Sequence, residues 1–282
     1  MEINWYPGHM AKTRRMVLEN LKNIDIVVEI LDARIPKASK NPDIADLISN
    51  KPKMLILNKS DLSDPVQNNK WLAYYTQEGY STILYNSKSS GVSGKSIFLQ
   101  TVKDLYKEKA ERNLKRGMIN RAIRLMILGI PNVGKSTLIN NLSGTKSAKA
   151  EDRPGVTRGK QWISLSNGID LLDTPGILWP RLEDRETAVK LAITGAIKDN
   201  ILDLEALSIK LLYILVQSYR EQLKVRYKLD DIPEDINELL KLIGKKRGFI
   251  ISGGEVDIER TAIILLDEFR ACKIGNITLE LL

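Results

Sequence analysis

The sequence predicts an α/β domain built on a mainly parallel sheet, followed by an all-helical domain. Up to Pro180, short aliphatic segments alternate with polar stretches of helix length, which is typical of parallel α/β folds. After Pro180 this rhythm stops, and apolar residues recur at the spacing of amphipathic helices. A chain of 282 residues is long enough for about two domains. We therefore expect residues 1–180 and residues 181–282 to form the two domains.

Six short segments rich in aliphatic and β-branched residues are the expected strands. They are residues 24–31, 54–57, 82–85, 123–128, 162–165 and 169–172. The last two flank a turn, so we expect them to pair as an antiparallel hairpin at one edge of the sheet. The basic stretch at residues 89–121 is expected to contain a charged connecting helix. The helical domain is expected to use the apolar runs at residues 202–215, 236–243 and 263–269.

Charge and composition limit the possible functions. With 43 Lys and Arg against 35 Asp and Glu, the net charge of +8 favours a polyanionic partner, either nucleic acid or an anionic membrane surface. One cysteine, Cys272, and one histidine, His9, are too few for an internal disulfide or a Cys/His zinc site. The chain has neither an apolar run of about 18 residues nor the pattern of a signal peptide. We therefore expect a cytoplasmic protein that is not inserted in a membrane.

The strongest functional pattern, Gly129–Ser136, has the spacing of a phosphate-binding loop and lies between a predicted strand and a predicted helix. In such a loop the glycines let backbone N–H groups turn toward phosphates, Lys135 reaches the β- and γ-phosphate oxygens, and Ser136 is a magnesium ligand. A purely structural glycine turn is the alternative. The residues expected to contact the phosphates are Ile130, Pro131, Asn132, Val133, Gly134, Lys135, Ser136 and Thr137.

A second pattern, Asp173–Gly176, begins at the end of the last predicted strand. Asp173 is expected to hold the hydration shell of Mg²⁺, and the Gly176 amide is expected to approach the γ-phosphate closely enough to sense it. Thr157, in the preceding loop, is a candidate to complete the magnesium shell in the triphosphate state. Its alternative is an ordinary polar loop residue. Together these residues predict a nucleotide-dependent switch.

A third pattern, Asn58–Asp61, follows a predicted strand and indicates guanine as the base. The Asp61 carboxylate can accept hydrogens from guanine N1 and N2, a pair of donors that adenine lacks. Lys59 is expected to lie along the base and to tie down the phosphate loop, which Asn58 braces. A lysine-rich turn is the alternative interpretation. The residues expected to contact the base or hold its site are Asn58, Lys59, Asp61, Asn86 and Ser87.

The serial order of these patterns is unusual. In regulatory G domains the phosphate loop precedes the guanine-reading segment, whereas here Asn58 precedes Gly129. The sequence therefore predicts a circularly permuted G domain of the P-loop NTPase class. Such a permutation leaves the pocket intact, because the ends of a domain usually lie close together on its surface. It also makes the segment after Asp173 lead directly into the helical domain, to which we expect switch motions to be transmitted.

Taken together, these motifs resemble those of the YlqF family of circularly permuted ribosome biogenesis GTPases, over nearly the whole chain. The matching segments are Trp5–Lys12, Asp32–Pro36, Asn58–Asp61, Gly129–Ser136, Asp173–Pro180 and Thr194–Lys198. The resemblance implies a GTPase that acts in late maturation of the large (50S) ribosomal subunit and is stimulated by that particle. It also implies that the helical domain contacts ribosomal RNA.

The sequence leaves the catalytic group open, because Ile177 stands where Ras-like enzymes place a water-orienting glutamine. His9 is a candidate for positioning or deprotonating the attacking water, and its alternative is a surface or RNA-contacting role. The other candidate is a potassium ion held by Asn132, whose alternative role is to brace the loop. The expected ligands are therefore GTP or GDP, Mg²⁺ and, in the second case, K⁺.

Two basic clusters are candidates for contact with ribosomal RNA phosphates, which predicts a salt-sensitive association. They are Lys12, Arg14 and Arg15 in one cluster and Lys245, Lys246 and Arg247 in the other. DNA is not an expected partner, and the oligomeric state is left open. The competing function is an RNA-binding assembly placeholder that uses GTP only as a conformational ligand. A metabolic ATPase or kinase is disfavoured by Asp61.

Overall fold

The computed structural model describes residues 15–42, 48, 51–89, 92–117, 121–144, 161–165, 168–174, 176 and 184–282. Within this part of the chain, strands form a six-stranded sheet in the order β3-β2-β1-β4-β6-β5. Their bounds are Ile26–Asp32 (β1), Lys53–Asn58 (β2), Ser81–Tyr85 (β3), Ile123–Gly129 (β4), Gln161–Leu165 (β5) and Ile169–Asp173 (β6). The predicted strands are confirmed, with small differences at their ends.

The sheet is mainly parallel, as predicted, and β5 is an edge strand that pairs antiparallel with β6. Because the other strands are parallel, their carboxyl ends meet at one edge of the sheet. Asp32 lies opposite Asn58 in the register of β1 and β2, and Asp173 lies opposite Ile127 near the end of β4. The strand order therefore brings the guanine-reading segment and the phosphate loop to the same edge, although they are far apart along the chain.

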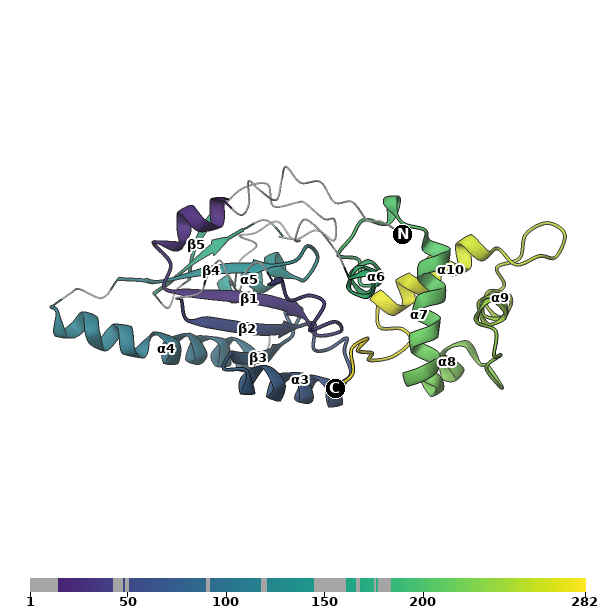
Figure 1. The fold of residues 1–282 in the computed structure, drawn as a ribbon, viewed down its shortest axis with the longest axis horizontal. Helices are drawn as coiled ribbons and strands as arrows, with labels where there is room; N and C mark the ends of the chain where they lie inside the picture. Colours follow the sequence, from purple (N-terminus) through teal and green to yellow (C-terminus); the bar gives the residue numbers. More distant parts are fainter. Residues whose placement is uncertain are drawn as a thin grey trace.

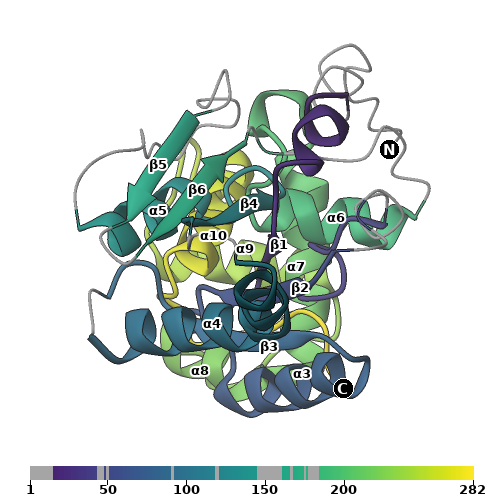
Figure 2. The ribbon, with the colours of Figure 1, turned by 90° about the vertical axis from the view of Figure 1, so that its left-hand side faces the viewer.

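Helices cover both faces of the sheet. Leu55 and Leu57 of β2 pack with Trp71 of helix α3 (Pro65–Gln77). The alternate residue Ile56 belongs to the cluster on the other face, which includes Phe98. Phe98 lies on α4 (Val92–Lys115), the charged helix that the sequence predicts, and α5 (Lys135–Ser143) shares this face. Figure 2 shows α3 on one side of the sheet and α4 and α5 on the other. This alternation follows from the two-residue period of a strand.

The part of the chain after residue 184 is helical, as the apolar periodicity predicts. Its helices are α6 (Arg185–Ile193), α7 (Leu204–Ser218), α8 (Arg220–Tyr227), α9 (Ile236–Lys246) and α10 (Ile258–Arg270), with a short 3₁₀ turn at Asp199–Ile201. Helices α6, α7, α9 and α10 each begin after an aspartate whose side chain accepts backbone N–H groups of the first turn. Figure 1 shows α7–α10 gathered beyond one end of the sheet. None of the described helices is long and apolar enough to cross a membrane.

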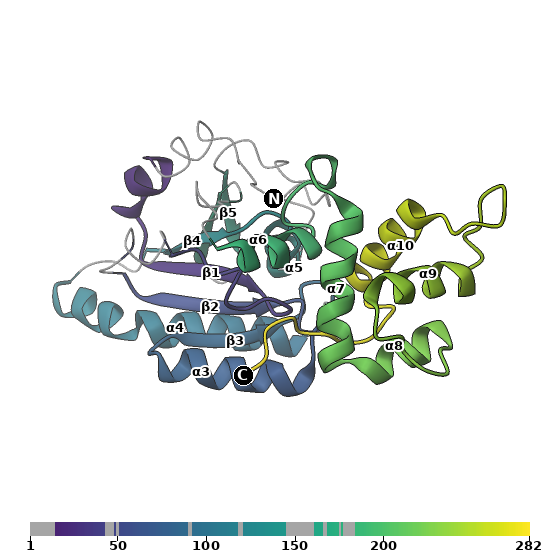
Figure 3. The same cartoon turned by 45° about the vertical axis from the view of Figure 1, so that its right-hand side comes forward.

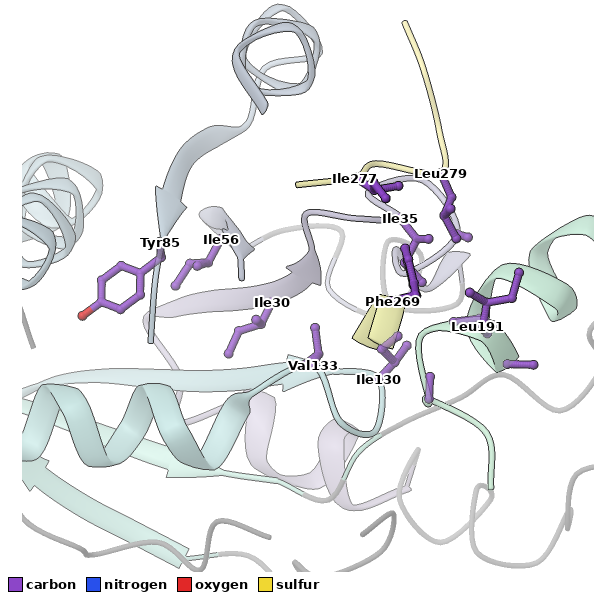
Figure 4. Packing of buried hydrophobic residues seen from close by; sticks show 14 of the residues in the cluster. Ile30, Ile35, Ile56, Tyr85, Ile130, Val133, Leu191, Phe269, Ile277 and Leu279 are labelled. Atoms are coloured by element: carbon purple, nitrogen blue, oxygen red, sulfur yellow. The ribbon is translucent and has the colours of Figure 1, made fainter. Parts of the chain in front are cut away.

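One apolar core runs through both parts of the molecule. It includes Ile30 and Ile56 from the sheet, and Val133 from the loop after β4. On the helical side it includes Leu191 and Phe269 (Figure 4). Burying these side chains together stabilises the contact between the two parts, because their apolar surface is removed from water.

Residues 271–282, which we call the C-terminal segment, leave the helical part and return to the sheet without forming another helix. The Leu279 N–H donates to the Arg34 carbonyl over 2.7 Å, and the Trp71 indole N–H donates to the Glu280 carbonyl over 2.8 Å. The end of the chain lies beside α3 (Figures 1 and 3). This segment is therefore packed against α3 and the loop after β1, although it follows the helices in sequence.

Candidate functional site

The phosphate loop connects β4 to α5 directly. Gly134 is the N-cap of α5 with φ +98°, a left-handed conformation that favours glycine, and α5 has no side-chain cap at that end. Gly129 passes so close to β1 that an added Cβ would lie 2.7 Å from the Ile30 carbonyl oxygen. The first N–H groups of α5 therefore open onto the loop without a capping side chain, which suits them to bind an anion. Ser136 and Thr137, in this first turn, are half-buried.

Lys135 folds back over the loop. Its Nζ donates to the carbonyl oxygens of Gly129 at 3.0 Å and Ile130 at 2.9 Å, and its side chain is buried. Burial lowers the pKa of the Lys135 ammonium to about 8; Asp173 opposes this lowering, and Lys59 adds to it. A positive charge held in this way gains from the approach of an anion, because few water molecules compensate it in the folded protein.

Asp173 and Gly176 lie against the phosphate loop. Asp173 ends β6, and its Oδ1 is buried and has no hydrogen-bond partner among the residues described. Burial raises the pKa of the Asp173 carboxyl, while the charge of Lys135 opposes the rise. A Cβ added to Gly176 would lie 2.9 Å from Pro131 Cα, so a side chain at this position would collide with the loop backbone. The structure thus brings Lys135, Asp173 and Gly176 together around the phosphate loop.

The guanine-reading segment is bonded directly to the phosphate loop. Asn58 Nδ2 donates to the Val133 carbonyl over 2.8 Å. Lys59 Nζ donates to the Asn132 carbonyl over 2.6 Å. The Asn58 Oδ1 accepts from the Ser87 hydroxyl over 2.7 Å, which links the loop after β3 to the same network. These contacts put Asn58 and Lys59 in the bracing positions expected of them.

Asp61 and Asn86 lie on neighbouring loops at the base end of the site. The Ser60 N–H donates to the Tyr85 carbonyl over 3.2 Å, which joins the two loops. Asn86 Oδ1 accepts from the backbone N–H groups of Lys88 and Ser89, so its side chain shapes its own loop. Asp61 is exposed, and its carbonyl oxygen accepts from Asn276 Nδ2 over 2.6 Å. The Asp61 side chain is therefore accessible to a base.

An ion triad of the buried Asp32 and Arg34 with the half-buried Lys59 was missed by the sequence reasoning. The Asp32 carboxylate accepts from Arg34 over 2.7 Å and from Lys59 over 2.9 Å. Burial opposes ionisation, but the two cations outweigh it and hold the pKa of Asp32 well below its usual range. The Arg34 guanidinium also lies 5.5 Å from the centre of the Phe269 ring on α10. Asp32–Pro36 was noticed only as part of a resemblance, because nothing in its spacing predicts a partner in α10.

The phosphate loop also contacts the helical part. Asn132, with φ +56°, donates from Nδ2 to the Gly195 carbonyl over 2.7 Å. Arg270 of α10 holds the same turn, because its Nε donates to the Ile193 carbonyl over 2.9 Å and its guanidinium pairs with Asp199. The Asn132 side-chain amide therefore links the phosphate loop to the turn that follows α6. This contact resembles the alternative role of Asn132, which is to brace the loop.

Some expected residues lie outside the described part of the chain. They are His9, Lys12, Arg14, Thr157 and Ile177. Of the two basic clusters, Arg15 pairs with Glu19 on the surface over 2.9 Å, and Lys245 and Lys246 are exposed. Arg247 instead joins Arg226 on the buried Glu268 carboxylate. Arg247 thus contacts α10 through Glu268, a buried carboxylate that also binds Arg226 and Tyr227.

Comparisons with known proteins agree with this geometry. A family model described as 50S ribosome-binding GTPase matches residues 124–251. The ribosome biogenesis GTPase A of Priestia megaterium is 50% identical over 281 residues, which cover 99% of this chain and 97% of that protein. A GDP-bound structure of TM YlqF is similar with a TM-score of 0.67 and 26% identity, covering 94% of this chain and 98% of that chain. A GNP-bound structure of YlqF from T. maritima has a TM-score of 0.65 and 26% identity, covering 95% and 97%.

Proposed function

The chain belongs to the ribosome biogenesis GTPase A (YlqF) family, and we propose that it hydrolyses GTP on the assembling large (50S) ribosomal subunit. In this proposal, the particle stimulates a slow intrinsic activity, and hydrolysis accompanies a late maturation step and release of the protein. The protein acts in the cytoplasm. Support comes from the relative named as a ribosome biogenesis GTPase and from the match to a 50S ribosome-binding GTPase.

One observation carries the proposal: the guanine-reading segment and the phosphate loop form one hydrogen-bonded unit. Lys59 reaches the Asn132 carbonyl over 2.6 Å, and Asn58 reaches the Val133 carbonyl over 2.8 Å. A single nucleotide can therefore place its base at Asp61 and its phosphates at Lys135. The exposed Asp61 carboxylate favours guanine, because an adenine base would leave it without a matching pair of donors.

The phosphates are bound by Lys135 and by the backbone N–H groups of residue 130 and residues 132–137. Ser136, Asp173 and, in the triphosphate state, Thr157 would hold Mg²⁺ in this proposal. The buried Asp173 Oδ1, which has no hydrogen-bond partner in the described residues, fits a hydrated divalent cation. When bound, the ion supplies positive charge to the β- and γ-phosphate oxygens. The Gly176 amide approaches the γ-phosphate in this proposal and senses whether it is present.

In hydrolysis, a water oxygen bonds to the γ-phosphorus while the bond to the β–γ bridging oxygen breaks, which yields phosphate and GDP. The Lys135 ammonium stabilises the charge that develops on the phosphate oxygens. His9 would position the water or take its proton; in the alternative, Asn132 would hold a K⁺ ion, whose positive charge would offset the charge that develops on the phosphates. A His9→Ala variant that keeps particle-stimulated turnover would exclude the first role. An unchanged rate after replacement of K⁺ by Na⁺ would exclude the second.

Ribosomal RNA is the proposed partner of the helical domain, residues 181–282, and residues 1–180 form the G domain. Lys245 and Lys246 are exposed on α9 and bind RNA phosphates in this proposal. Replacing both by alanine should reduce the salt dependence of association by about one unit of slope for each phosphate that the protein no longer neutralises. Arg247 should be left in place in this test, because it pairs with Glu268.

The decisive experiment is single-turnover GTP hydrolysis with and without purified large-subunit particles. We expect acceleration by the particle, and co-sedimentation with it that differs between GDP and a non-hydrolysable GTP analogue. Binding without acceleration would favour the assembly placeholder instead. Equal affinities for GDP and ADP would reject a guanine-specific site altogether.

A further inference from the structure

The loop that carries Asp61, residues 59–64, is held from two sides. On one side Lys59 contacts the phosphate loop. On the other side the C-terminal segment contacts the loop, with a weak bond from Cys272 Sγ to the Leu62 carbonyl over 3.8 Å and three shorter bonds. Asn276 Nδ2 donates to the Asp61 carbonyl over 2.6 Å, the Ile277 N–H donates to the Leu62 carbonyl over 3.3 Å, and the Asp64 N–H donates to Thr278 Oγ1 over 3.1 Å.

The C-terminal segment is a firm support for that loop. Ile277, Thr278 and Leu279 are buried, and the Thr278 N–H donates to the Tyr219 hydroxyl of the helical part over 3.1 Å. The buried Glu280 carboxylate accepts the Lys37 N–H over 2.6 Å, so the segment is also fixed to the loop after β1. Groups tied to several elements in this way have little freedom to move.

The charge of Lys135 tolerates small displacements better than the Asp61 carboxylate does. The Lys135 charge acts over several ångströms, whereas a carboxylate that accepts two hydrogens from one base must lie within hydrogen-bond distance of both. The Asp61 carbonyl belongs to the same residue as this carboxylate. The bond from Asn276 therefore limits the position of the carboxylate through its own backbone.

We propose that Asn276 is a positioning residue for guanine recognition, which makes the C-terminal segment part of the base-binding site. This inference rests on the proposed function, in which Asp61 reads guanine. Asn276 does not touch the nucleotide in this proposal. It acts through Asp61, and its loss should affect the recognition of the base rather than the binding of phosphates.

The test compares the affinities of GDP and inosine diphosphate, measured by titration calorimetry, in the wild type and in Asn276→Ala. Inosine diphosphate has the same phosphates but lacks the N2 amino group that Asp61 is expected to bind. We expect the preference for GDP over inosine diphosphate to fall by about 2- to 10-fold in the variant, the usual effect of removing one hydrogen bond. Asn276→Asp, which cannot donate and adds a negative charge near Asp61, should lower the preference at least as much.

Leu281→Ala is the matched control, because it truncates a half-exposed side chain in the same segment. Its preference should equal that of the wild type, and thermal unfolding should show that all variants are folded. An unchanged preference in both Asn276 variants would overturn the inference. So would an equal loss of affinity for both nucleotides, which indicates a structural role only. A wild type that does not distinguish GDP from ADP would instead overturn the proposed function.

Discussion

The phosphate end and the base end of the pocket are built in different ways. At the phosphate end, consecutive residues between β4 and α5 form the loop, and Lys135 folds back onto Gly129 and Ile130. At the base end, the loop that carries Asp61 depends on residues distant in sequence, including Asn276. The phosphate loop is thus formed by consecutive residues, although Asn58 and Lys59 brace it, whereas the loop at the base end is also held by the far end of the chain.

This difference explains how the motifs can be permuted. A strand, a glycine loop and a helix form a phosphate site wherever they occur in the chain. The guanine-reading segment needs only to end a neighbouring strand at the same edge, and β2 does so although it precedes β4. What matters is the order of strands in space, because parallel strands present their carboxyl ends together.

The largest expected effect is that of Gly134→Ala, which would damage both ends at once. The new Cβ would overlap Asn58 Nδ2, and the backbone would remain in a left-handed conformation. The left-handed backbone would cost about 1–3 kcal/mol with alanine, and the disturbed Asn58 bond would cost a similar amount. Because both costs destabilise the loop conformation that binds phosphates, GDP affinity should fall by about 100-fold or more. Gly144→Ala is the control, since its φ is +70° but nothing lies within 4 Å of the added Cβ. GDP affinities are measured by calorimetry. Similar affinities in the two variants would contradict the connection that Gly134 and Asn58 make between the phosphate end and the base end.

Asp61→Ala should damage the base end alone. Hydrogen bonds to a charged acceptor contribute about 1.5–3 kcal/mol, so removing the carboxylate should lower GDP affinity by about 10- to 150-fold. The affinity for ADP, which uses the same phosphate end but gains nothing from Asp61, should not fall and serves as the internal control. Equal losses for GDP and ADP in equilibrium titrations would show that the ends are not separable.

A pH titration should report on the phosphate end. In the free protein, burial lowers the pKa of Lys135 to about 8, and bound phosphates should raise it again because they favour the ammonium form. Binding therefore takes up a proton above pH 8, and GDP affinity should weaken by up to about tenfold per pH unit in that range. Lys135→Arg does not titrate there, so its affinity should depend less on pH. If the GDP affinities of the wild type and of Lys135→Arg changed with pH in parallel, the pH dependence would not come from Lys135.

The smallest expected effect concerns the contact of the phosphate loop with the helical part. Asn132→Gly keeps the left-handed backbone but removes the bond to the Gly195 carbonyl. The free energy of unfolding should fall by about 0.5–1.5 kcal/mol in chemical denaturation without nucleotide. Lys228→Gly, at φ +53° on an exposed cap, controls for the glycine itself. An equal change in the free energy of unfolding of both variants would show that the Asn132 amide does not stabilise the protein.

Particular residues show how far the sequence could predict this site. Asn58, Lys59 and Lys135 were assigned roles from their motifs, and in the structure all three side chains bond to carbonyl oxygens of the phosphate loop. Arg34 and Asn276 could not be found, because their partners in α10 and in the Asp61 loop lie far away in sequence. Arg247 looked like part of an RNA-binding cluster, since its pairing with Glu268 depends on how two helices pack.

The amino-acid sequence alone determined the strands, the helical region and the phosphate loop, because these depend on the period of apolar residues and on the backbone freedom of nearby glycines. Only the tertiary structure decided that the C-terminal segment returns to the Asp61 loop, and that Asp32 joins Lys59 to Arg34. Those contacts result from the packing of one continuous core, whose geometry no local pattern contains.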